Sequence, residues 1–387
     1  MRGSTVRKIA FIVGPSVILL LVVLLMPLVA APPELGPAPA GLERDYWPTN
    51  SWIKTTPEEQ GLDHAVLRAG TNYLREHYPN TTGFLVVRNG YLVWEEYIGG
   101  NTNFRTISSL RSVTKSITGT LIGIALQRGD IESLDQPLSD FFPEYFAANP
   151  SKSARGSTTI RELLTMQSGI EWDERRPPIS FAPNTNVIDE MLALPQTAPP
   201  GEEYRYSSAD AHLLSGIITR ATGMTAIRYA GKYLFEPLGI GTRQWFTDPQ
   251  LNEYGGTGLF LNAREMALFG MLYLNEGYWE GQQIFSREWA SQALDRQVLL
   301  RREVKEEDLP PVWYGYQWWV RDQGGHMAGM AVGFGGTYIV VVPDLDMVIV
   351  ITSDINVAPL PDDMRGTNEV DFSFFEDYVI AALVNAQ

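Results

Sequence analysis

Strand patterns occur at both ends of the chain, and helical patterns occupy its middle. Residues 83–100, GFLVVRNGYLVWEEYIGG, indicate two strands joined at Asn89-Gly90, a dipeptide typical of two-residue hairpin turns. Near the other end, strands are indicated by YGYQWWV (314–320), GTYIVVVP (336–343) and DMVIVITS (346–353). Because helical patterns and loops lie between these groups, we expect an α+β fold with one sheet built from both chain ends and a helical region inserted into it.

Helix signals have the expected start and stop residues. Helices are predicted within residues 63–77, 207–223, 262–277 and 372–384, the last of them amphipathic. Thr159 and Glu162 form a plausible capping box for one more helix. Gly223 and Gly277 are expected to end two of the helices.

These patterns suggest a division of the chain. We expect one domain over residues 51–387, with an α/β part from 51–129 and 301–387 and a mostly helical part from 130–300. Residues 32–50 are rich in proline and read as a linker.

The first 31 residues have the pattern of an export signal. Basic residues precede an uncharged stretch over 9–33, which contains an unbroken apolar run at 17–26. This pattern predicts a signal peptide or an uncleaved signal anchor, and Pro32-Pro33 make a poor cleavage site, which slightly favours the anchor. A buried core helix is disfavoured because a proline-rich polar stretch follows. In both cases we expect the rest of the chain to be exported to the periplasm or the extracellular face.

Composition excludes several classes of function. The net charge of −15 argues against nucleic acid or anionic lipid as the main partner, so we expect membrane contact only through the N-terminal segment. The absence of cysteine removes disulfides, thiolate nucleophiles and cysteine-based zinc sites. The four histidines are not spaced as a metal motif, which argues against a metalloenzyme. We expect no metal or organic cofactor, and the oligomeric state stays open.

A lysine lies near the start of an apolar helical stretch, LRSVTKSITGTLIGIAL (110–126). Ser112 and Lys115 are three residues apart, which places both side chains on one face of a helix. A serine hydroxyl needs an adjacent base to act as a nucleophile, and a lysine desolvated by apolar packing can lose its proton and become that base. The alternative is a chance Ser-x-x-Lys whose lysine reaches out of the helix to solvent.

Five segments in order resemble one family. They are SSLRSVTKSITGTLIGIA (108–125), TIRELLTMQSGI (159–170), a stretch from PGEEYRYSSAD (200–240), a stretch from GGTGLFLNAREM (255–284) and GFGGTYIVVVPDLDMVIVITS (333–353). The chain resembles the serine hydrolases of the class C β-lactamase type, a broad family that includes DD-peptidases, esterases, D-aminopeptidases and 6-aminohexanoate-dimer hydrolases. The resemblance spans roughly residues 60–385. It implies a β-lactamase/transpeptidase-like fold, with an antiparallel sheet flanked by helices and a mostly helical inserted part.

The resemblance also assigns roles to residues. Ser112 and Lys115 occupy the Ser-x-x-Lys positions, and Tyr206 matches the family's catalytic tyrosine, which can relay the proton of the nucleophile. Tyr204 is the other candidate for the catalytic tyrosine. The structural alternative is that Tyr206 is an ordinary tyrosine of the core. Ser208 stands where the family has a substrate-holding asparagine.

A second departure lies in the last segment. The family's Lys-Thr-Gly has no counterpart, and AVGFGGTY (331–338) stands in its place. Both departures argue against a β-lactam as the substrate. In these two respects the chain is more similar to the 6-aminohexanoate-dimer hydrolase and esterase branches of the family.

The glycine-rich run suggests an oxyanion hole. The Ser112 amide is expected to supply one donor and the Phe334 N–H the second, with Gly333 and Gly335 beside it; a strand bulge is the alternative. Trp172 and Asp173, with Glu174 after them, are expected to line the substrate pocket together with Ser208.

A Ser-His-Asp triad with His326 is disfavoured because the chain has no G-x-S-x-G elbow. From the Ser112–Lys115 pair and the family resemblance we predict an exported serine hydrolase that cleaves a small-molecule amide or ester through a Ser112 acyl-enzyme. The alternative is a penicillin-binding or cell-wall-sensing protein with slow or no turnover.

Overall fold

The computed structural model describes residues 44–99, 102–175, 182, 184–241, 243–300, 311–356 and 372–384. The predicted export segment (1–31) and most of the predicted linker (32–50) lie outside these residues. Within them, no helix combines the length and the apolar character that crossing a membrane requires.

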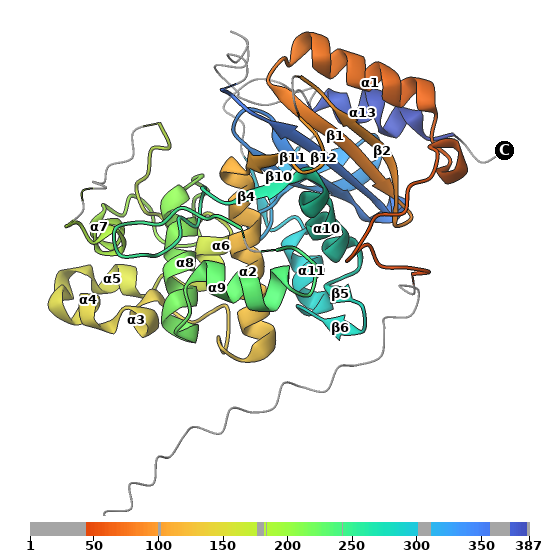
Figure 1. Cartoon of the computed structure of the whole chain (residues 1–387). Helices are drawn as coiled ribbons and strands as arrows, with labels where there is room; N and C mark the ends of the chain where they lie inside the picture. Colours follow the sequence, from red (N-terminus) through yellow and green to blue (C-terminus); the bar gives the residue numbers. More distant parts are fainter. Residues whose placement is uncertain are drawn as a thin grey trace, which may run out of the picture. The chain divides into compact units, whose positions relative to one another are not determined.

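In the part of the chain that the structure describes, one sheet of eight strands combines strands from near both ends of the chain, as the sequence predicts (Figure 1). Every neighbouring pair is antiparallel, and β1 near the start pairs with β12 near the end, with Phe84 opposite Ile351. In spatial order the strands are β2 (Tyr91–Tyr97), β1 (Thr81–Arg88), β12 (Met347–Ser353), β11 (Thr337–Val342), β10 (His326–Gly333), β9 (Trp319–Gln323), β8 (Val312–Tyr314) and β7 (Val298–Leu299).

The predicted hairpin and one predicted strand have different outcomes. Asn89 and Gly90 join β1 to β2 with φ angles of 51° and 86°, the left-handed conformation that a two-residue hairpin turn requires. The continuous strand predicted over 314–320 is wrong, because the chain turns between β8 and β9. Gln317 has a φ of 63° there, and its side chain donates hydrogen bonds to the Leu163 and Leu164 carbonyls.

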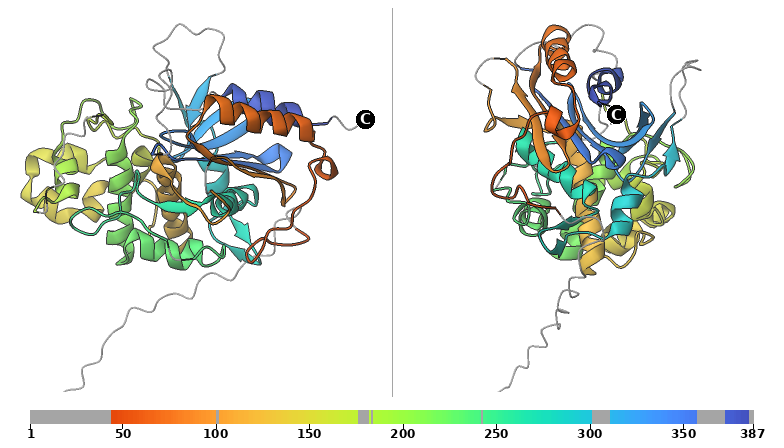
Figure 2. Two further views of the ribbon diagram at one scale, coloured as in Figure 1. Left: turned by 45° about the horizontal axis from the view of Figure 1, so that its top comes forward. Right: turned by 90° about the vertical axis from the view of Figure 1, so that its right-hand side faces the viewer.

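Helices cover both faces of the sheet. Alternate residues of β1 belong to different cores: Phe84 and Val86 pack beneath α1 (His64–His77) and α13 (Ser373–Tyr378), and Leu85 and Val87 belong to the other core. Figures 1 and 2 show α1 and α13 side by side on one face. On the other face, α10 (Ala263–Leu274) packs against β1, β11 and β12, so this helix of the predicted helical part belongs to the sheet's packing.

Next to α10 lies a group of helices, and all but one of them fall within residues 130–300, the range predicted to be mostly helical. The exception is α2, which falls in the range predicted as α/β; it packs against α8 and is buried all round, from Thr114 to Ala125. These helices are α2 (Thr114–Arg128), α3 (Leu138–Phe141), α4 (Pro143–Ala148), α5 (Ser153–Gly156), α6 (Ile160–Leu164), α7 (Val187–Ala193), α8 (Ser208–Thr222), α9 (Ala226–Ala230) and α11 (Arg287–Ala293).

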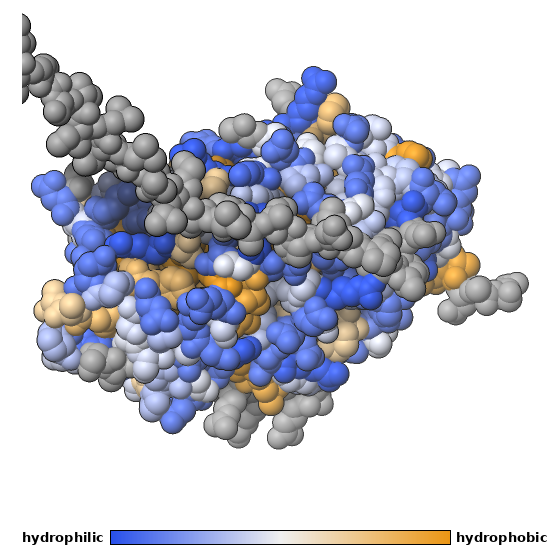
Figure 3. Space-filling model, turned by 90° about the horizontal axis from the view of Figure 1, so that it is seen from below, coloured by the Kyte–Doolittle hydropathy of each residue, from blue (hydrophilic) through white to orange (hydrophobic). Residues whose placement is uncertain are grey.

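Short elements complete the fold. Two small ribbons pair β3 (Ile107–Ser109) with β4 (Phe260–Asn262), and β5 (Tyr278–Trp279) with β6 (Gln282–Gln283). Short helical turns are η1 (Glu58–Gln60), η2 (Arg111–Val113), η3 (Pro150–Lys152), η4 (Gly231–Phe235, a π turn), η5 (Pro343–Leu345) and η6 (Ile380–Ala382). The face in Figure 3 is mostly hydrophilic, with an apolar area left of its centre.

The predicted helix ends are mostly confirmed. The Thr159–Glu162 capping box opens α6, and Gly223, with a φ of 68°, caps α8. The last residue of α10 is Leu274, and its C-cap is Asn275, two residues before the predicted Gly277. The predicted C-terminal helix is shorter than expected, since α13 stops at Tyr378 and a 3-10 turn follows.

Candidate active site

Ser112 lies in a tight turn, not on the helix itself. The turn is η2, directly before α2, and Arg111 within it has a φ of 50°. A left-handed conformation is uncommon for a residue other than glycine, and such residues concentrate at functional sites. The end of β10 lies against this turn, because a Cβ on Gly333 would be 2.6 Å from the Leu110 carbonyl oxygen. Glycine at 333 therefore allows the strand to approach the nucleophile.

Lys115 points back at Ser112 from the first turn of α2. Its Nζ is 3.2 Å from Ser112 Oγ, 2.8 Å from Ser208 Oγ and 3.2 Å from the Gly256 carbonyl oxygen. The side chain is buried, with 1% exposed, so the alternative of a lysine reaching out to solvent is excluded. Among the described residues, no carboxylate forms a direct ion pair with it. The amine therefore meets only neutral oxygens and one aromatic ring.

That ring belongs to Tyr206. The Lys115 Nζ lies 4.6 Å from the ring centroid, and the ring packs against Trp319 at 5.6 Å. Within the described residues the Tyr206 hydroxyl makes no hydrogen bond to Ser112 or Lys115. Tyr204, the rival, packs its ring against Tyr314 at 5.4 Å and does not line the cavity. The structure thus places Tyr206, and not Tyr204, beside the serine and the lysine.

Ser208 connects the lysine to a carboxylate. As the first residue of α8, it donates its backbone N–H to Glu174 Oε1 (2.5 Å) and its hydroxyl to Glu174 Oε2 (2.9 Å). The same hydroxyl oxygen accepts a hydrogen bond from Lys115. A serine at this position, where the family has asparagine, therefore still contacts the catalytic lysine.

The other residues of the Glu174 loop do not lie where the sequence suggested. Trp172 is buried in the core with 6% exposed, and Asp173 turns to Arg175, whose backbone N–H it accepts at 2.9 Å. Neither lines the cavity, which corrects the expectation for both residues. Burying the large apolar side chain of Trp172 in the core is more favourable than exposing it in the cavity wall. Glu174 is therefore the residue of this segment that faces the site.

The predicted oxyanion donors lie together. Ser112 and Phe334 both line the cavity, and neither backbone N–H has an acceptor among the residues that the structure describes. Gly335 differs, because its carbonyl oxygen accepts a hydrogen bond from Asn80 Nδ2 at 2.6 Å and the residue does not line the cavity. The prediction of Gly335 as a substrate contact is therefore corrected, and Phe334 N–H is the amide available beside Gly333.

These groups surround one cavity of about 580 Å³, a size suited to a small molecule. Sequence reasoning missed Arg111, Gly256 and Thr257 as parts of its wall. The cavity is lined by Arg111, Ser112, Glu174, Arg175, Tyr206, Ser208, Gly256, Thr257, Trp319, Val332, Gly333 and Phe334. The glycine pair at 255–256 was the available signal, since a Cβ on Gly256 would lie 2.9 Å from Ser208 Oγ.

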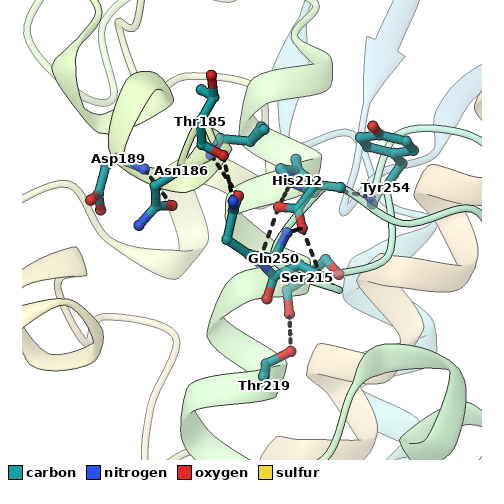
Figure 4. A network of polar contacts seen from close by, with 12 residues as sticks. Thr185, Asn186, Asp189, His212, Ser215, Thr219, Gln250 and Tyr254 are labelled. Atoms are coloured by element: carbon teal, nitrogen blue, oxygen red, sulfur yellow. Dashed lines mark hydrogen bonds and ion pairs between the residues drawn. The ribbon is translucent and has the colours of Figure 1, made fainter. Parts of the chain in front are cut away.

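A buried polar network around His212 holds the Gly256 segment in place. Figure 4 shows His212 together with Gln250 and Tyr254. His212 Nδ1 accepts the Gly255 N–H at 3.4 Å, so we assign the ring proton to Nε2, which donates to Asp248 Oδ2 at 3.1 Å. Burial alone would raise the pKa of Asp248, but hydrogen bonds from His212 and Asn252 outweigh it and lower that pKa. The network ties the loop to α8 and thereby sets where the Gly256 carbonyl meets Lys115.

His326 lies outside this site. His326 pairs with Asp344 at 2.7 Å at the opposite end of β10 from Gly333, outside the cavity lining. In the part of the chain that the structure describes, no group of three or more acidic, histidine or cysteine side chains could hold a metal ion.

The fold and the Ser112–Lys115 pair define a serine hydrolase of the β-lactamase type. A family model described as "Beta-lactamase" matches residues 80–372, and the chain belongs to the β-lactamase family. The predicted family and fold class are thereby confirmed, and the protein is a serine hydrolase.

Individual relatives have names that occur in the predicted family. A 6-aminohexanoate-dimer hydrolase of Paenarthrobacter ureafaciens is 24% identical over 290 residues, which cover 70% of this chain and 71% of the relative. A putative D-alanyl-D-alanine carboxypeptidase of Escherichia coli K12 is 22% identical, and the match spans about half of each protein, 48% and 49%.

Solved structures share the fold. A putative 6-aminohexanoate-dimer hydrolase from Bacillus anthracis superposes with a TM-score of 0.63 at 24% identity, covering 81% of both chains. EstCE1, described as a hydrolase with promiscuous acyltransferase activity, also gives a TM-score of 0.63, at 14% identity, covering 85% of this chain and 99% of its own.

Proposed function

We propose that the protein hydrolyses a small-molecule amide or ester through an acyl-enzyme on Ser112, with Lys115 as the base. The observation that carries this proposal is the buried Lys115 amine, 3.2 Å from the Ser112 hydroxyl. As a neutral amine, Lys115 donates its two hydrogens to Ser208 Oγ and the Gly256 carbonyl. Its lone pair then points at the Ser112 O–H.

The reaction follows from this arrangement. Ser112 Oγ bonds to the substrate carbonyl carbon while its proton passes to Lys115 Nζ. The Ser112 and Phe334 amides hold the negative charge that develops on the carbonyl oxygen. The leaving group departs with a proton relayed from Lys115 with the help of Tyr206, which lies over the amine. Water then attacks the acyl carbon, Lys115 takes a proton from it, and the acid and free Ser112 are released.

Two features support a substrate other than a β-lactam. Ser208 replaces the asparagine of the family pattern, and its hydroxyl already contacts Glu174 and Lys115. The Lys-Thr-Gly cation has no counterpart in the sequence. The 6-aminohexanoate-dimer hydrolase among the relatives suggests linear amides as the first substrates to screen. We further propose, from the uncharged stretch at 9–33 alone, that the protein is exported and held at the membrane by this segment.

The experiment is hydrolysis of a p-nitrophenyl ester by the full chain and by Ser112→Ala. We expect Ser112→Ala to lose at least about 10³-fold in turnover, because the nucleophile is gone. Ser151→Ala, an exposed serine in the helical part, is the control and should keep full activity. Unchanged hydrolysis by Ser112→Ala would refute the proposed nucleophile. A labelled penicillin that stays bound after washout, without ester turnover, would instead favour a binding or sensing protein.

A further inference from the structure

Glu174 is the carboxylate that lines the cavity, within the described residues. It lies on the loop between α6 and α7, and both of its oxygens are used on one residue. Oε1 accepts the Ser208 backbone N–H at 2.5 Å, and Oε2 accepts the Ser208 hydroxyl at 2.9 Å. An ionised carboxylate can only accept hydrogen bonds, so these two contacts fix the direction of the Ser208 proton.

That direction determines what Ser208 can do for Lys115. Because the single hydroxyl proton points at Glu174, Ser208 Oγ presents a lone pair to Lys115 Nζ, 2.8 Å away. The Gly256 carbonyl, at 3.2 Å, can likewise only accept. Without Glu174, the Ser208 hydroxyl could turn and donate to the amine lone pair, and it would then compete with Ser112 for the base.

The carboxylate also acts through its charge. The two hydrogen bonds through Ser208 place Glu174 Oε2 within about 6 Å of Lys115 Nζ, so the negative charge favours the ammonium that forms when Ser112 loses its proton. Other charged or titratable groups face the same region: Arg111, Arg175 and Tyr206 in the cavity wall, and Asp210 and Tyr314 behind it. None of them is hydrogen-bonded to Ser208 Oγ in the described part of the chain.

We propose that Glu174 is a positioning residue that acts on Lys115 through Ser208. It orients the Ser208 hydroxyl so that the amine lone pair is left for Ser112, and it stabilises the ammonium that forms during acylation. The serine at position 208 and the glutamate at 174 work as one unit in place of the asparagine of the family pattern. This inference rests on the proposed acyl-enzyme function.

The test compares Glu174→Gln with the unmodified full chain in ester hydrolysis across pH. Glutamine lacks the charge, and its NH2 group replaces one of the two oxygens that accept from the N–H and the hydroxyl of Ser208. We expect kcat to fall about 10- to 100-fold with KM changed less than about threefold, since Glu174 acts on the base and not on substrate binding. The acid limb of kcat/KM should move to lower pH, because removing a negative charge favours the neutral amine.

The matched control is Glu171→Gln, which makes the same change on the same loop at an exposed side chain. It should leave kcat and the pH profile unchanged. Ser208→Ala provides a second route, because it removes the hydroxyl link and keeps the backbone N–H. We expect it to lower kcat similarly, and Glu174→Gln added to it should lower kcat clearly less than Glu174→Gln does alone, because only the effect of the charge then remains.

Two results would overturn the inference. One is a Glu174→Gln enzyme with normal kcat and an unshifted acid limb. The other is full additivity of the Glu174 and Ser208 substitutions. The proposed function is tested separately by Ser112→Ala: if that variant is inactive while Glu174→Gln is normal, only the role of Glu174 fails.

Discussion

Replacing Gly123, in the middle of α2, by alanine is predicted to destabilise the protein, although alanine has the higher helix propensity. An ideal Cβ at this position would lie 2.4 Å from two ring carbons of Trp289 and 2.6 Å from its Nε1. The Trp289 ring is buried and cannot swing away easily, because its Nε1 donates to Tyr273 Oη, which in turn bonds Thr120 on α2 at 2.7 Å. The glycine therefore lets α2 and α11 approach closely.

The magnitude follows from two opposing effects. Carbon atoms pack at about 3.5 Å or more, so α2 and the ring must separate by roughly 1 Å. Overpacking of a core costs about 1–3 kcal/mol, whereas alanine gains up to about 1 kcal/mol over glycine inside a helix. The cost of overpacking is larger than the gain in helix propensity, so we expect Gly123→Ala to lower the free energy of unfolding by about 1–2 kcal/mol.

Urea unfolding of Gly123→Ala and Gly231→Ala measures this balance. Gly231 also has helical backbone angles, with a φ of −53°, and a Cβ there would meet nothing within 4 Å. The control substitution should therefore stabilise the protein by about 0.5–1 kcal/mol. If Gly123→Ala stabilises the protein as much as Gly231→Ala does, with an unchanged denaturant slope, the close approach of α2 and Trp289 is wrong.

Three further predictions concern the site and its surroundings. Gly256→Ala should lose about 100-fold in kcat without a change in melting temperature, because its Cβ would lie 2.9 Å from Ser208 Oγ and displace the hydroxyl. Burial raises the pKa of Asp210 from 3.8 to about 7, although hydrogen bonds from two serines partly oppose it, so the folded state binds this proton more tightly. Stability should fall as pH rises from about 4 to about 7, and Asp210→Asn should remove that slope in urea titrations at pH 5 and pH 8. Burial opposes ionisation of Glu95, but hydrogen bonds from Arg264, Lys54 and Tyr97 lower its pKa to about 2, so its stabilisation is present above pH 4.5 and is lost as pH falls toward 2. Glu95→Gln should cost about 1–3 kcal/mol at pH 7 and flatten the acid limb of the stability profile.

Local patterns explain which parts of the fold could be predicted from the sequence. Asn89-Gly90 specifies a turn by its own backbone preferences, and the Ser112–Lys115 pair needs only the geometry of one helical turn. The break at Gln317 could not be read from the aromatic run around it. It follows from contacts with the Leu163 and Leu164 carbonyls, more than 150 residues away.

The same reasoning separates the predicted from the missed parts of the site. The Gly256 carbonyl reaches Lys115 from 141 residues away, held there by the His212–Asp248 pair, and no periodicity records such a contact. The sequence offered three adjacent residues, from Trp172 to Glu174, as candidates for the lining of the substrate pocket. Which of them faces the cavity is set by the burial of the tryptophan and by the position of Ser208 at the start of α8.

The central claim is tested most directly by trapping the covalent intermediate. The full chain is mixed rapidly with an activated ester, quenched in acid, and analysed by intact mass and peptide mapping. We predict one acyl group per chain, on the peptide that contains Ser112, and none in Lys115→Met, which keeps the nucleophile but removes the base. Ester turnover with no adduct, or an adduct on another residue, would contradict the account.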